Sequence, residues 1–321
     1  MSGATRVGVV GLNYWGPNLV RNFDGLAELA WVCDLDPEHL RPTADRYPHA
    51  KATESFDDVL ADDSLDAVVI ATPVPTHYAL AKQALEAGKH VFVEKPPAMR
   101  AAEMDELVEL AAERDLVLMP GHLLLYHPAV AKLKELIDSG ELGDVLCVYG
   151  NRVNLGIVRT NENALWSLGV HDLSVILHLL DEDPELATAQ GSASINPGVE
   201  DVVFCFLRFP SGKIAHMHLS WLDPHKMRKM TVVGREKMVV FDDTEPERKI
   251  TVYEKSAGAS GELHSGDIHI PKISTAEPLK LECAYFLELI EGRHDRAQVA
   301  REGARVVRAL EMLTNSLATD G

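Results

Sequence analysis

The stretch RVGVVGLNYWGP, residues Arg6–Pro17, decides the fold of this chain. Its first half is a short Val- and Gly-rich run that predicts a buried parallel strand, and Gly11 permits the tight turn that leaves it. Gly16 lets the following helix pack close to the sheet, and Pro17 suits the first turn of that helix. The pattern is a dinucleotide fingerprint, G-x-G-x-x-G, in which Asn13 replaces the middle glycine.

The surroundings of this turn favour a cofactor site. Asp34 ends the next apolar run about 20 residues after Gly11, where a carboxylate can bind ribose hydroxyls and repel a 2′-phosphate. Backbone N–H groups at the start of the helix would face the cofactor pyrophosphate. We therefore expect NAD, with NADP as the alternative because Arg41 or Arg46 could pair with a 2′-phosphate. The predicted contacts within the turn are Gly11, Asn13, Tyr14, Trp15 and Gly16.

Short apolar runs alternate with amphipathic stretches as far as residue 121. Such alternation predicts an α/β domain with a doubly wound parallel sheet, the Rossmann architecture, over residues 1–121. The predicted helices include Tyr78–Ala87, closed by Gly88 at a position that needs positive φ, and Ala101–Arg114. The predicted strands are Arg6–Gly11, Leu29–Cys33, Asp66–Ala71, His90–Val93 and Leu116–Met119.

Beyond residue 121 the pattern changes to strands without helices between them. This predicts an α+β domain with a large, mostly antiparallel open sheet over residues 122–321, whose last helices can pack back on the first domain. The Gly/Ser-rich segment Ser256–Ile268 has no periodicity and is predicted to be a mobile loop. The predicted strands are Val145–Val153, Val202–Phe209, Lys213–Trp221, Lys229–Val233, Met238–Phe241 and Lys249–Tyr253; the predicted helices are Pro128–Ile137, Val170–Leu180, Leu279–Ile290 and Ala297–Thr314.

The charge balance excludes some classes of partner. There are 31 Lys and Arg against 49 Asp and Glu, a formal net charge of −18, which argues against nucleic acid and against an anionic membrane surface. No apolar run approaches the roughly 18 residues that span a bilayer. The amino terminus leaves no room for a signal sequence before the first strand, and the four cysteines lie far apart, so we expect a cytoplasmic protein with free thiols.

Polar residues follow the predicted strands at the edge where open α/β sheets bind ligands. They are Thr72, Pro73 and His77, then Glu94, Lys95 and Pro96, then His122. Lys95 would point at the nicotinamide, where a partly desolvated lysine can exchange a proton with a reacting hydroxyl. A cis Pro96 would fix its direction. The alternative interpretation is a surface lysine paired with Glu94.

Several longer segments resemble the Gfo/Idh/MocA oxidoreductases, and the resemblance covers nearly the whole chain. They are Gly11–Phe23, Gly88–Pro96, Gly121–Pro128, Arg152–Gly156, Leu165–Asp172 and Ser220–Arg228. The resemblance implies an NAD(P)-dependent dehydrogenase acting on a CH–OH group. The most similar branch oxidises the 3-hydroxyl of nucleotide-linked sugars of the UDP-N-acetylglucosamine type.

The family's sugar pocket is lined by the lysine of E-K-P and by a D-x-x-x-H pair, which here would be Lys95 and His171. Ser167 replaces the aspartate, so Ser167 with a water could substitute for it, His171 alone could serve as base, or activity could be altered. We favour His171, because an imidazole titrates near neutral pH. The sugar contacts that the resemblance implies are His122, Tyr126, Arg152, Asn154, Arg159, Asn163, Trp166, Ser167 and His171.

Other interpretations stay open. Arg152, Arg159, Lys226 and Arg228 could bind a pyrophosphate or merely pair with surface carboxylates. The rival functions are an NADPH-dependent ketoreductase of a deoxysugar nucleotide, an inositol or polyol dehydrogenase, and a non-catalytic NAD-binding sensor. His216-x-His218 could suggest a metal, but it has no evident partner ligand, and we predict no metal site. The open sheet needs a cover on its second face, which predicts a homodimer or homotetramer.

Overall fold

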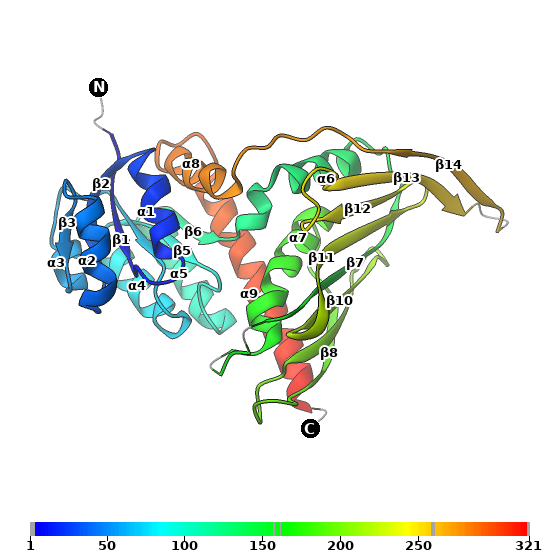
Figure 1. Ribbon diagram of the computed structural model, residues 1–321, viewed down its shortest axis with the longest axis horizontal. Helices are drawn as coiled ribbons and strands as arrows, with labels where there is room; N and C mark the ends of the chain where they lie inside the picture. The colour runs from blue at the N-terminus through cyan, green and yellow to red at the C-terminus, as the bar shows by residue number, and fades with distance from the viewer. Residues whose placement is uncertain (1–3, 157, 161, 258–260, 320–321) are drawn as a thin grey trace. The chain divides into compact units, whose positions relative to one another are not determined.

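The computed structural model describes residues 4–156, 158–160, 162–257 and 261–319. The chain divides into two compact units (Figure 1). The first comprises residues 1–123 and 277–307, and the second residues 124–276 and 308–321. None of the helices in the described ranges is long and apolar enough to cross a membrane.

The first unit contains a six-stranded sheet in the order β3-β2-β1-β4-β5-β6, with every neighbouring pair parallel. This is the doubly wound order, which confirms the predicted Rossmann fold. The strands are β1 Arg6–Val10, β2 Glu28–Cys33, β3 Lys51–Thr53, β4 Ala67–Ile70, β5 His90–Glu94 and β6 Leu118–Gly121. All five predicted strands are present; β3 was not predicted, because KAT carries no apolar run.

Helices flank this sheet (Figure 1). They are α1 Gly16–Asp24, α2 Pro37–Arg46, α3 Phe56–Leu60, α4 His77–Glu86, α5 Ala101–Glu113, α8 Pro278–Ile290 and the first half of α9 Arg296–Thr319, with the short turn η1 Val74–Thr76. The α4 helix ends as predicted, since Gly88 has φ +75°. On one face Phe23, Phe92 and Phe286 join α1, β5 and α8 through edge-to-face contacts with centroids 5.7–6.2 Å apart.

The second unit contains an eight-stranded sheet in the order β14-β13-β12-β11-β7-β10-β9-β8. Its neighbours pair antiparallel except β7 and β10, which confirms the mostly antiparallel sheet. The strands are β7 Val145–Leu155, β8 Leu186–Ser192, β9 Val202–Arg208, β10 Ile214–Ser220, β11 Leu222–Gly234, β12 Met238–Asp242, β13 Ile250–Ala257 and β14 Leu263–His269. The helical segments are η2 Leu123–Tyr126, α6 Pro128–Asp138, η3 Leu165–Gly169 and α7 Val170–Leu180.

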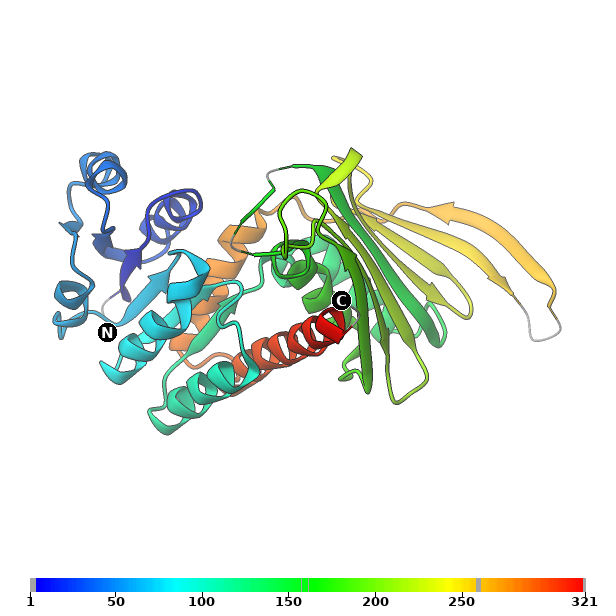
Figure 2. The same cartoon turned by 90° about the horizontal axis from the view of Figure 1, so that it is seen from below.

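One face of this sheet is covered by α7 and the end of α9 (Figure 2). Burial alternates along β10, because Ala215, Met217 and Leu219 are buried while His216 is exposed. The prediction of a mobile loop over Ser256–Ile268 is wrong for the described part of that segment. Strands β13 and β14 pair there as a hairpin, and residues 258–260 lie outside the described residues. The β14 strand of this hairpin is exposed and held by backbone hydrogen bonds. Such a strand needs no apolar residues, so the sequence shows no apolar pattern that would predict it.

Candidate functional site

The turn after β1 needs its two glycines. Gly11 has φ +91°, and a Cβ there would lie 2.6 Å from the carbonyl carbon of Ala71. A Cβ on Gly16 would lie 1.9 Å from the Gly11 carbonyl oxygen. Gly11 therefore packs directly on the loop after β4, at the point where the strand order reverses and where such sheets bind their ligands. Asn13 and Tyr14 are exposed beside this turn.

Asp34 lies against the same turn. Its carboxylate accepts the Leu12 N–H at 2.6 Å and the Asp36 N–H at 2.9 Å, and the His39 ring is 3.7 Å away. An acidic group is thus fixed beside the backbone amides of the fingerprint, where a ribose hydroxyl could donate to it. Arg41 and Arg46, the alternative partners for a 2′-phosphate, are both exposed on α2.

Leu35, which was not among the predicted residues, is 83% exposed directly after Asp34. An apolar side chain left in solvent at this edge could pack against a flat ring such as adenine. The sequence signal that could have found Leu35 is its position: it is an apolar residue directly after Asp34, outside the apolar run that predicts the strand.

His77 joins the loops that follow β4 and β5. Its ring is 1% exposed, with Nε2 2.7 Å from the Thr72 carbonyl oxygen and Nδ1 2.8 Å from the Pro96 carbonyl oxygen. Burial lowers the pKa of His77. The Lys95–Pro96 peptide bond is cis. Through His77 the Lys95–Pro96 segment is held at the same edge as Thr72, whose backbone also approaches Gly11. His77 would therefore shape a cofactor site by holding Thr72 and Pro96 in place.

The ends of β5 and β6 bring further titratable groups together. Burial raises the pKa of Glu94 to about 7, opposed by the positive charge of Lys95 and by hydrogen bonds from the Lys95 N–H and the Trp15 side chain. Burial and the Lys95 charge lower the pKa of His122 to about 4. Among the described residues the His122 Nε2 has no hydrogen-bond partner. This edge therefore holds a neutral imidazole, a lysine and a carboxyl group that titrates near neutral pH.

Three predicted substrate residues of the second unit are bound by the protein itself. Arg152 on β7 is buried and donates to the Asp172 carboxylate at 2.7 and 2.9 Å. Trp166 is 4% exposed, and its indole donates to Thr314 at 3.0 Å. The Asn163 amide donates to Glu200 at 2.7 Å, while its oxygen accepts the Trp166 N–H. These contacts give the three side chains partners within the second unit, and their contact with a substrate stays a prediction.

The remaining predicted substrate residues are more accessible, with one exception. Asn154 on β7, Tyr126 in η2 and His171 in the first turn of α7 are half-buried. Arg159 is exposed and pairs with Glu162 at 2.8 Å. Ser167 is 5% exposed inside η3. Lys95 belongs to the first unit and His171 to the second, so their meeting in one pocket stays a prediction.

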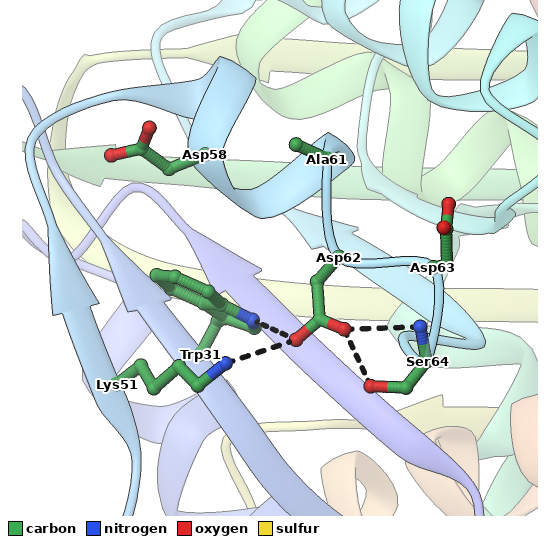
Figure 3. A pocket seen from close by; sticks show the side chains of 7 residues that line it. All are labelled: Trp31, Lys51, Asp58, Ala61, Asp62, Asp63 and Ser64. Carbon is green, nitrogen blue, oxygen red and sulfur yellow. Dashed lines mark hydrogen bonds and ion pairs between the residues drawn. The ribbon is translucent and has the colours of Figure 1, made fainter.

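Two other polar features stand apart from these residues. A hollow beside β2 and β3 is lined by Trp31, Lys51, Asp58, Ala61, Asp62, Asp63 and Ser64 (Figure 3). The Asp62 carboxylate in this hollow accepts a hydrogen bond from the Trp31 indole N–H at 2.8 Å. The lining includes the first residue of β3 and the residues that lead into β4, so the hollow lies away from the carboxyl ends of these strands. On the β13–β14 hairpin, Glu254, Asp267 and His269 place potential metal ligands within 4.8 Å of one another, but the Lys237 ammonium lies 3.6 Å from Glu254.

His216 and His218 take part in ring stacking. The His216 ring stacks on Tyr149 with centroids 5.0 Å apart, and the His218 ring on Phe204 at 4.4 Å. Within the described ranges neither belongs to a group of three potential metal ligands.

The chain matches two family models. Residues 5–122 match an oxidoreductase family with an NAD-binding Rossmann fold, and residues 130–240 match the GFO/IDH/MocA C-terminal domain. It is 28% identical to UDP-N-acetylglucosamine 3-dehydrogenase from Acidithiobacillus ferrooxidans, over 79% of this chain and 78% of that protein. A solved structure of that protein superposes with a TM-score of 0.87, at 25% identity and 99% coverage of both chains.

Two other proteins are similar to this chain. The structure of GenD2 from gentamicin A biosynthesis in complex with NAD superposes with a TM-score of 0.84, at 25% identity, over 100% of this chain and 96% of that one. Inositol 2-dehydrogenase from Salmonella typhimurium is 27% identical over 62% of this chain and 68% of that protein.

Proposed function

Because this chain belongs to the Gfo/Idh/MocA family and is an NAD(P)-dependent dehydrogenase acting on a CH–OH group, we propose that its substrate is a nucleotide-linked sugar. The reacting group is the secondary hydroxyl at C3 of a sugar such as UDP-N-acetylglucosamine, and the cofactor is NAD. The name of the relative from Acidithiobacillus supports the substrate. The position of Asp34 beside the fingerprint supports NAD over NADP.

The observation that carries the proposal is the set of contacts along the carboxyl edge of the first sheet. Gly11 packs on Thr72, and His77 joins Thr72 to Pro96, next to Lys95. The backbone segment that carries Lys95 is therefore held at the edge that contains the dinucleotide turn, where the proposal has the Lys95 side chain meet the substrate hydroxyl. This is the arrangement that oxidation of an alcohol by a bound dinucleotide needs.

The proposed chemistry divides between the protein and its cofactor. Bound NAD supplies the nicotinamide that accepts the hydride from the sugar carbon. The Lys95 ammonium group donates a hydrogen bond to the sugar hydroxyl, and His171 takes the hydroxyl proton as the carbonyl forms. His171 suits this role because an imidazole titrates near neutral pH. With Ser167 where the family has an aspartate, His171 alone serves as the base.

The experiment is a substrate panel. The purified protein is incubated with NAD and, in separate assays, UDP-N-acetylglucosamine, other UDP- and dTDP-sugars, and inositol, while the absorbance of reduced nicotinamide is followed. A 2-oxo acid is added in parallel as oxidant, because tightly held cofactor would hide turnover. We expect reduction with UDP-N-acetylglucosamine and a 3-keto product by mass spectrometry. Turnover of inositol alone would overturn the nucleotide-sugar proposal. If the protein binds NAD but turns over none of these substrates, the result would favour the non-catalytic NAD-binding sensor.

We also propose a homodimer or homotetramer built through the outer face of the second sheet. This face carries exposed apolar side chains, of which Phe204 is 56%, Leu146 42% and Phe206 38% exposed. Apolar side chains gathered on one sheet face indicate a surface that another subunit covers. Sedimentation of the wild type and of Phe204→Asp tests this. A monomeric wild type would contradict it, and the variant is expected to dissociate.

The cytoplasm is the proposed location. All four cysteines are free in the structure, and three of them are buried. Reduced thiols suit a compartment without disulfide chemistry.

A further inference from the structure

A buried carboxyl group on α8 has no role in the chemistry described so far. Glu282 is 0% exposed, and among the described residues neither of its carboxyl oxygens has a hydrogen-bond partner. A carboxylate charge without partners is costly inside a protein, so such a group keeps its proton. Burial, together with the charge of Glu94, raises the pKa of Glu282 well above its ordinary value.

Glu282 and Glu94 lie on the same side of the first unit. Phe92 precedes Glu94 by two residues on β5 and therefore shares its face of the sheet. Phe286 follows Glu282 by four residues on α8 and shares its helix face. The two phenylalanine rings are in contact, with centroids 5.7 Å apart. Glu94 on β5 and Glu282 on α8 therefore each lie next to a phenylalanine of the same ring contact, on the same face of their strand or helix.

The Glu94 side chain reaches across the end of the sheet. Its carboxyl carbon lies 3.2 Å from where a Cβ on Gly121 would be, so it passes over the end of β6. Its carboxylate accepts hydrogen bonds from the Lys95 N–H, at 3.3 Å, and from the Trp15 side chain in the phosphate turn. Glu94 therefore joins the proposed cofactor loop to the segment that carries Lys95.

The other titratable groups near this pair hold one charge state around neutral pH. Burial lowers the pKa of His122 to about 4 and also lowers the pKa of His77, so both imidazoles are neutral. Burial raises the pKa of Cys283, the neighbour of Glu282, so its thiol is neutral. From α1, Arg21 is paired with Glu277. Lys95 contributes a positive charge. Glu94 is left as the group that changes charge near pH 7.

We propose that Glu282 is a positioning residue, which stays uncharged and supports the negative charge of Glu94. Glu94 is then the single negative charge of the carboxyl pair. This charge makes the site bind NAD⁺ in preference to NADH. The inference rests on the proposed function, because it takes the nicotinamide to bind at the carboxyl end of β5. A turn of either side chain, or one bridging water, would join the Glu282 hydroxyl to the Glu94 carboxylate. A negative charge there attracts the cationic ring of NAD⁺ and not the neutral ring of NADH.

Calorimetric titration with NAD⁺ and with NADH, from about pH 5.5 to about pH 8.5, tests the cofactor preference. For the wild type we expect NAD⁺ affinity to rise about tenfold with a midpoint near pH 7, while NADH affinity changes little. Glu94→Gln should remove this dependence. Glu282→Gln keeps a donor and should leave the midpoint in place, whereas Glu282→Leu should raise it by about one pH unit. Glu288→Leu, on the same helix and half exposed, is the matched control and should leave it unchanged.

The outcomes separate this inference from the proposed function. No binding of either cofactor would overturn the proposed function. Binding of both with a pH-independent ratio, or an unchanged midpoint in a folded Glu282→Leu variant, would overturn the inference alone. Infrared spectroscopy gives a readout without cofactor: the carbonyl band of a protonated carboxylic acid should persist at about pH 8.5, where Glu94 is charged, and disappear in Glu282→Gln. Its absence from the wild type would also overturn the inference.

Discussion

The candidate cofactor edge of the first unit differs from the predicted substrate residues of the second in what holds them. In the first, backbone geometry places the residues: Gly11 packs on Thr72, and His77 binds two carbonyl oxygens. In the second, Arg152 and Trp166 are tied to Asp172 and Thr314. A motif fixed by backbone shape predicts local geometry well, whereas a polar residue type alone does not separate a ligand contact from a structural partner.

The largest expected effect is on Lys95. Lys95→Ala should lower turnover of the nucleotide sugar by about a thousandfold, because the loss of one positioned donor at the reacting oxygen costs about 10²–10³-fold. The variant should still bind NAD in calorimetry, since the phosphate turn and Asp34 are untouched. Lys82→Ala is the control, because Lys82 is a half-buried lysine on α4 that pairs with Glu106, and this variant should turn over like the wild type. Retained turnover in Lys95→Ala would remove the lysine from the chemistry.

The next prediction concerns Arg152, a predicted substrate residue of the second unit that is bound to Asp172. Arg152→Met should lower the free energy of unfolding by about 3 kcal/mol in urea, because it leaves the Asp172 charge buried without a partner. The double variant Arg152→Met with Asp172→Leu should recover most of that loss, since an apolar pair can replace a buried ion pair. If Arg152 instead bound the substrate pyrophosphate, the single variant would keep its stability and raise KM.

The phosphate turn gives the next effect. Gly16→Ala should weaken NAD binding by about tenfold or more, because its Cβ would meet the Gly11 carbonyl oxygen at 1.9 Å and the turn must shift. Gly25→Ala is the matched control, since its nearest contact would be an ordinary 3.6 Å. Equal cofactor dissociation constants for the two variants would show that the turn does not form the binding site.

The smallest expected effect concerns cofactor choice. Asp34→Asn keeps a hydrogen-bonding side chain beside Leu12 but removes the charge that repels a 2′-phosphate. The ratio of NAD to NADP affinity should fall about tenfold, or roughly 1.4 kcal/mol. Parallel titrations with the two cofactors measure it. A wild type that already prefers NADP would contradict the interpretation of Asp34.

The sequence predicted the features that have a local physical signature. The apolar strand runs, the glycines and the Gly88 helix end follow from periodicity and from backbone conformation. Strand β3, strand β14 and the end of β13 were not predicted, because they are stabilised by pairing with a neighbouring strand and not by an apolar pattern, whereas the first half of β13 was predicted. Glu282 escaped because one carboxyl group on an amphipathic helix reads as a solvent-facing residue. Its burial depends on which elements pack on α8, and that is decided by the fold as a whole.

The aromatic contact between α1, β5 and α8 has a consequence for synthesis of the chain. The strands of the first sheet are complete by Gly121, but Phe23 and Phe92 pack against Phe286, which emerges from the ribosome much later. An isolated fragment ending near residue 123 would leave this ring surface in water, so the nascent Rossmann half should attract chaperones until the last helices are made. Excising the nucleotide-binding half as an independent module would require splicing residues 277–307 onto it.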